Sequence, residues 1–67
     1  MKHQQLDRFL LSLETIYGQS LMQARKDARL RMDYESRANV LIKAQGTDYV
    51  AITIEIGEWN KTYTIKG

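Results

Sequence analysis

The residues most able to do chemistry are scattered along this chain rather than grouped. The single histidine, His3, stands in a segment expected to fray, and the chain has no cysteine. A surface histidine is therefore expected, rather than a base or a metal ligand. The serines at 12, 20 and 36 lack a nucleophile-elbow motif, and the glycines form no phosphate-binding loop. Because no acidic pair stands out either, the sequence predicts no catalytic residue, no cofactor, no metal site and no enzyme.

A basic segment is the first grouping above this background. Between Gln23 and Arg31, four positive residues are opposed by Asp27 alone, which gives the segment a charge of +3 in a chain of net charge +2. Such a flank could neutralise nucleic-acid phosphates. It could equally be a solvated helix end, where cations favour the helix dipole. The candidate nucleic-acid-binding residues are Arg25, Lys26, Arg29 and Arg31.

Two aromatic residues, Tyr49 and Trp59, are candidates for binding a partner. Tyr49 falls on the outer face of the expected sheet, where stacked aromatics would be needed to bind single-stranded nucleic acid, and it is the only aromatic residue securely placed there. Trp59 falls at an expected hairpin tip. It either folds over the edge of the core or anchors an interface. The outer face is expected to hold Leu41, Tyr49, Thr53, Thr62 and Thr64, with Lys43 and Lys66.

An amphipathic helix must position the basic segment. Apolar residues recur at spacings of three and four from Leu6 to Met32, and the pattern repeats every eleven residues, close to the pitch of an α-helix. The helix is expected to end between Met32 and Ser36, within the polar segment 33–37. The buried stripe is predicted to consist of Leu6, Leu10, Leu13, Tyr17, Leu21, Ala24, Ala28 and Met32.

Gly18 leaves the continuity of this helix open. It could be a left-handed cap that ends one helix, with Ser20 and Gln23 forming a capping box that begins another. Against that interpretation, the apolar stripe crosses Gly18 without a change of phase, and one interior glycine costs only about 1 kcal/mol relative to alanine. The pattern therefore favours a continuous or gently kinked helix.

The rest of the chain alternates as β-strands do. Strands are predicted over 38–45, over 49–56 with its clear Val/Ile face, and over 61–66; turns are predicted at 46–48 and 57–60. The fold class is therefore α+β: one domain, residues 1–67, with the helix on a three-stranded antiparallel meander. The expected core is Leu6, Phe9, Leu10, Leu13, Tyr17 and Leu21 against Val40, Ile42, Val50, Ile52, Ile54 and Ile65. This order resembles the first part of a double-stranded-RNA-binding domain, but no second helix with a basic motif follows, so we assign no family.

The length of the helix predicts self-association. A continuous helix over 6–32 would be about 40 Å long, whereas strands of eight residues cover about 25 Å. The overhang would be buried against a second copy, giving a homodimer. A helix broken at Gly18 would instead fold back on its own sheet. The expected dimer interface is Tyr17, Leu21, Ala24, Ala28 and Met32.

These features leave two classes of function. The first is a small, non-enzymatic, self-associating protein that acts by protein–protein binding, as an inhibitor or adaptor. The alternative is a small nucleic-acid-binding regulator that uses the basic flank, for which the charge is modest. No apolar run is long enough to span a membrane and no signal-peptide core is present, so we expect a cytoplasmic protein.

Overall fold

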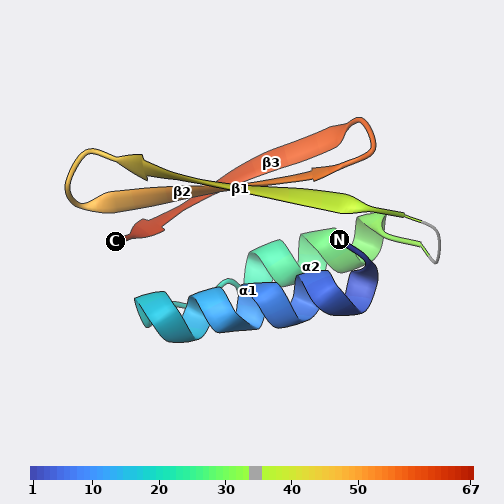
Figure 1. Cartoon of the computed structure of the whole chain (residues 1–67), viewed down its shortest axis with the longest axis horizontal. Helices are drawn as coiled ribbons and strands as arrows, with labels where there is room; N and C mark the ends of the chain where they lie inside the picture. Colours follow the sequence, from blue (N-terminus) through green and yellow to red (C-terminus); the bar gives the residue numbers. More distant parts are fainter. Residues whose placement is uncertain (34–35) are drawn as a thin grey trace.

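Two helices cover one face of a three-stranded sheet in the computed structural model, which describes residues 1–33 and 36–67 (Figure 1). The strands lie in the order β1-β2-β3, each antiparallel to its neighbour, which confirms the α+β meander. Part of the polar segment predicted to end the helix, residues 34–35, lies outside the described residues. The elements are α1 (His3–Tyr17), α2 (Met22–Arg31), β1 (Ala38–Gln45), β2 (Tyr49–Ile56) and β3 (Trp59–Lys66).

The chain reverses at Gly18, so the prediction of a continuous helix was wrong and the broken helix is correct. Gly18 has φ 65° and ψ 29°, the left-handed conformation that glycine adopts without steric cost, and its N–H donates to the carbonyl of Glu14. The predicted capping box is absent: the Ser20 hydroxyl accepts a hydrogen bond from the Met22 N–H, while Gln23 bonds Asp27. The stripe keeps its phase because both helices bury it against the same sheet.

The helix α1 already includes the segment that was expected to be an irregular lead-in. The helix begins at His3, and the Gln5 side chain accepts a hydrogen bond from the Lys2 N–H. Met1 is tied to the first residue of β1 by a reciprocal pair of bonds, from the Met1 amino group to the Ala38 carbonyl (2.6 Å) and from the Ala38 N–H to the Met1 carbonyl (2.8 Å). The N-terminus is thereby fixed beside the edge of the sheet.

The strand register places the Val/Ile face of β2 at the centre of the core. Ile52 pairs with Ile42 of β1 and with Tyr63 of β3. The second hairpin is tighter than the four-residue turn predicted: Ile56 pairs directly with Trp59, so β3 starts two residues earlier than expected. Gly57, with φ 60°, supplies the left-handed backbone that a two-residue hairpin turn requires.

The core differs from the prediction at its edges. Phe9, Tyr17 and Val40 are only partly buried. Ile42 is 44% exposed because the helices do not reach under the far half of β1. The residues expected at a dimer interface are instead part of the core: Leu21, Ala24, Ala28 and Met32 are each at most 9% exposed. The buried apolar residues are Leu6, Leu10, Leu13, Leu21, Ala24, Ala28, Met32, Ala38, Val50, Ala51, Ile52, Ile54, Ile56 and Ile65.

The two paired isoleucines on the inner face give a direct test of this core. Ile52 is fully buried, so Ile52→Ala should lower the free energy of unfolding by about 2–5 kcal/mol through lost burial and a cavity. Ile42→Ala, a matched change at its cross-strand partner, should cost less than half as much because that side chain is already partly solvated. Urea unfolding followed by circular dichroism measures both, at a protein concentration low enough for the chain to be monomeric. Equal losses would contradict the uncovered position of Ile42.

Candidate interaction surface

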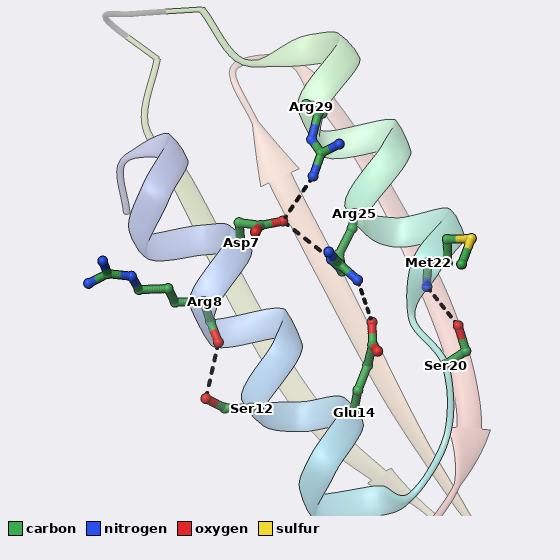
Figure 2. A network of polar contacts seen from close by, with 8 residues as sticks. All are labelled: Asp7, Arg8, Ser12, Glu14, Ser20, Met22, Arg25 and Arg29. Atoms are coloured by element: carbon green, nitrogen blue, oxygen red, sulfur yellow. Dashed lines mark hydrogen bonds and ion pairs between the residues drawn. The ribbon is translucent and has the colours of Figure 1, made fainter.

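Much of the basic flank holds the two helices together. Arg25 lies between two carboxylates of α1, with its Nε 3.3 Å from Asp7 Oδ1 and its Nη1 3.4 Å from Glu14 Oε1 (Figure 2). Arg29 approaches the same Asp7 oxygen at 3.5 Å. The hydrogen bond to Asp7, opposed in part by desolvation, raises the pKa of Arg25. Two of the four candidate phosphate-binding cations therefore face carboxylates of their own chain.

The other two members of the flank have separate surroundings. Arg31 stacks over the indole of Trp59, with the guanidinium carbon 4.5 Å from the ring centroid. Trp59 is partly buried and packs against the core, so of its two predicted positions it takes the one over the core edge. Lys26 is exposed. The flank is thus divided among an ion-pair network, an aromatic stack and one solvated lysine.

Asp27 forms the main polar link between α2 and β3. Its Oδ2 accepts a hydrogen bond from Tyr63 Oη at 2.7 Å and lies 3.3 Å from Lys61 Nζ, while Gln23 Nε2 donates to Oδ1 at 2.9 Å. The bond from Tyr63, followed by that from Gln23, holds the pKa of Asp27 below its ordinary value. Burial, then the bond to Asp27, raises the pKa of Tyr63. This cluster fixes α2 beneath β3.

The free edge of β1 has a defined hydrogen-bonding direction. Both bonds of Ala38 go to Met1 and not to β2, so the N–H and C=O of Ala38 point away from the sheet. By the alternation of an antiparallel strand, the backbone groups of Val40, Ile42 and Ala44 point the same way. Within residues 1–33 and 36–67, none of these three residues has a backbone partner on that side. The edge beyond Met1 is therefore open to another strand.

The side chains along this open edge are apolar and lie on the inner face. Val40 is half-buried, and Ile42 and Ala44 are exposed. The cause is the path of α1: it begins beside Ala38 on the edge of β1 and leads to Gln19, which bonds the opposite edge, at Lys66 of β3. A helix crossing the sheet in this way leaves the far end of β1 uncovered, and Figure 1 shows the turn between β1 and β2 projecting beyond α1.

A second apolar strip runs along α1 beside this uncovered end. Asp7 and Glu14 face α2 through their ion pairs, and residues two positions later point to the opposite flank of the helix. On this opposite flank, Phe9 is partly buried and Ile16 is 70% exposed. Figure 2 shows Ser12 on that same flank, away from the ion pairs. Together with the edge of β1, this flank defines the candidate interaction surface: Phe9, Ile16, Val40, Ile42 and Ala44.

The opposite edge of the sheet is polar and partly blocked. The Gln19 side chain donates to the Lys66 carbonyl at 2.5 Å and accepts from the Lys66 N–H at 3.0 Å, so it takes the place of a neighbouring strand there. The other residues of β3 whose backbone points outward, Thr64, Thr62 and Asn60, have polar side chains. The two edges are therefore chemically different.

The outer face of the sheet carries no helix (Figure 1). Tyr49 is 47% exposed there and Leu41 54% exposed, while Thr53 and Thr62 join their hydroxyls across the strands at 2.8 Å. Sequence analysis placed Tyr49 correctly on this face. It missed the open edge, because its expected core included Ile42. The apolar run Val40-Leu41-Ile42, which places apolar side chains on both faces of an edge strand, was the available signal.

Comparison with known proteins gives no relative to interpret this surface: no family model, no curated protein and no solved structure matches the chain. Within the described residues, no three acidic or histidine side chains converge on a position for a metal ion. None of the helices in that part of the chain is long and apolar enough to cross a membrane.

The Asp27 cluster predicts a pH dependence of stability. Because the folded-state pKa of Asp27 is lowered, the ionised carboxylate stabilises the fold above its ordinary pKa of 3.8, and this stabilisation is lost as the pH falls through the lowered value. Tyr63→Phe removes the largest cause of the shift. The variant should be less stable than the parent at neutral pH, with a smaller difference in acid.

Carboxyl titration by NMR should show the Asp27 pKa moving upward in Tyr63→Phe. Tyr49→Phe is the matched control, since it removes an exposed hydroxyl from the outer face and should leave the titration unchanged. An Asp27 pKa equal in all three proteins would contradict the role given to Tyr63.

Proposed function

We propose that this chain is a small, non-enzymatic, self-associating protein that acts by protein–protein binding, as an inhibitor or adaptor does. The observation that carries the proposal is the open, apolar edge of β1. Exposed strand edges with apolar side chains are templates for pairing, and natural proteins that remain monomeric protect them with charges, proline or bulges. Val40, Ile42 and Ala44 offer no such protection on the inner face, and the one charged residue of the strand, Lys43, lies on the outer face.

The distribution of positive charge favours this proposal over nucleic-acid binding. Arg25 and Arg29 approach the carboxylate of Asp7, so the flank presents less free positive charge than its composition suggests. Arg31 is stacked over Trp59. To bind phosphates, these cations would have to leave their present partners. The release of counterions from the nucleic acid would have to compensate for that loss. The nucleic-acid-binding regulator remains the alternative.

Self-association is tested by light scattering over a micromolar concentration series. We expect a dimer in the parent protein, and loss of that dimer in Ile42→Lys, because a charge on the inner side of an edge strand opposes strand pairing. Thr64→Lys places the same charge on the other edge strand and should remain dimeric. A parent that is monomeric over the whole series would refute the proposal.

Nucleic-acid binding is tested on the same protein at low salt. We expect no retention on duplex or single-stranded columns. If the protein is retained, and Arg25→Ala with Arg29→Ala weakens binding to all sequences and reduces the salt slope by about two, the alternative function is correct.

A further inference from the structure

We infer that a second copy of the chain pairs with the open edge of β1, antiparallel and around a two-fold axis through Ile42, so that the two three-stranded sheets become one continuous sheet. This inference rests on the proposed function and specifies its partner and geometry. The contact unit is the open edge of β1 itself: Val40, Ile42 and Ala44 of each copy.

Hydrogen-bond direction permits this pairing without rearranging either sheet. In an antiparallel pair, two facing residues whose backbone groups point toward one another exchange two N–H···O bonds. A two-fold axis through Ile42 sets Ile42 opposite Ile42 of the second copy and Val40 opposite Ala44. All three residues have outward N–H and C=O groups, so each pair matches donors with acceptors. Facing residues project to one side, which places the helices of both copies on the same side of the joined sheet.

Two features of the chain select this register over its neighbours. A shift that centres the axis on Leu41 would bring Ala44, which is a strand residue, opposite Ala38, whose backbone groups already bond Met1. With the axis at Ile42, the residue opposite Ala38 is Gly46, which lies in the turn after β1. A shift that centres it on Lys43 would place two lysines directly opposite each other, which is unfavourable. With the axis at Ile42, Lys43 lies opposite Leu41, whose exposed side chain its aliphatic stem can cover.

The uneven covering of β1 also favours a second copy as the occupant. Antiparallel pairing brings the helix-covered start of one β1 beside the uncovered end of the other, so each copy's α1 lies near the exposed apolar side chains of its partner. The flank of α1 that would meet there follows the helical spacing and consists of uncharged residues, with the exposed Arg8 beside Ser12 as the neighbouring charge (Figure 2): Gln5, Phe9, Ser12 and Ile16.

The polar edge of β3 limits the assembly to two copies. Gln19 occupies the outward bonds of Lys66, and Asn60, Thr62 and Thr64 offer no apolar side chains for a further strand. A contact that uses the β1 edge on both sides is isologous and closes after one pairing. The structure therefore points to a closed dimer rather than a fibre.

Single cysteines test the register directly, because the chain has none of its own. Facing residues of a hydrogen-bonded pair have Cα atoms about 5.5 Å apart, within the range of a disulfide, whereas diagonal neighbours are about 7–8 Å apart. In a glutathione redox buffer, Ile42→Cys should become a disulfide-linked dimer as the main species. Leu41→Cys and Lys43→Cys should remain largely reduced.

Proline substitution tests the hydrogen bonds without adding charge. Ala44→Pro removes only an outward N–H, which an edge strand tolerates, and it should raise the dimer Kd by at least about tenfold. Thr64→Pro makes the same change on the outward side of β3 and should leave the dimer Kd unchanged. Circular dichroism confirms that both variants are folded.

These outcomes separate the inference from the proposed function. A dimer that cross-links in Leu41→Cys or Lys43→Cys rather than in Ile42→Cys, or that is unaffected by Ala44→Pro, would retain self-association and refute this geometry. A monomeric parent with no cross-linked Ile42→Cys would refute both.

Discussion

The left-handed backbone at Gly18 is the constraint on which the arrangement of the whole chain depends. A residue with a Cβ atom would favour a helix running on past Tyr17, which would carry Leu21, Ala24 and Ala28 beyond the end of the sheet. With the reversal, the second half of the stripe returns over the same sheet, and all three side chains are buried there. The chain thereby covers the centre of its sheet with two short helices, of 15 and 10 residues, rather than one long one. The stripe is buried except at Tyr17, which is partly buried.

The reversal of the chain also determines which parts of the sheet remain exposed to solvent. The segment before Gly18 starts at the edge of β1, where Met1 bonds the strand backbone. The loop after Gly18 reaches the edge of β3, where the Gln19 side chain bonds the strand backbone. Helix α2 then returns along β3, where Asp27 and Arg31 fix it. Two helices placed in this way protect β2 and β3 but leave the far end of β1 exposed. The asymmetry between the two sheet edges is a direct result of helix placement.

The sequence predicted the elements well and their mutual placement less well. The periodicity of the stripe and the alternation from Val50 to Ile56 are local signals, so the fold class and much of the core could be predicted from them. The left-handed conformation of Gly18 could not be predicted in this way. One glycine costs a helix little, so the conformation is decided by how much of the apolar stripe one sheet can bury. The exposure of Ile42 is equally non-local: alternation identifies the inner face of β1 but does not say how far a helix extends beneath it.

The candidate site illustrates the same limit for charge. Arg25 and Arg29 are one helical turn apart, and Asp7 and Glu14 are two turns apart, so each pair presents its charges on one flank of its helix. Flanks of opposite charge on consecutive helices indicate that the basic segment faces its own chain. This signal can be interpreted only once the helix is known to be broken. A continuous helix would keep Asp7 and Arg25 roughly 27 Å apart along the axis, at about 1.5 Å per residue, and would leave the cations in solvent. The conformation of one glycine therefore decides whether the positive charge of this chain holds its helices together or faces a partner.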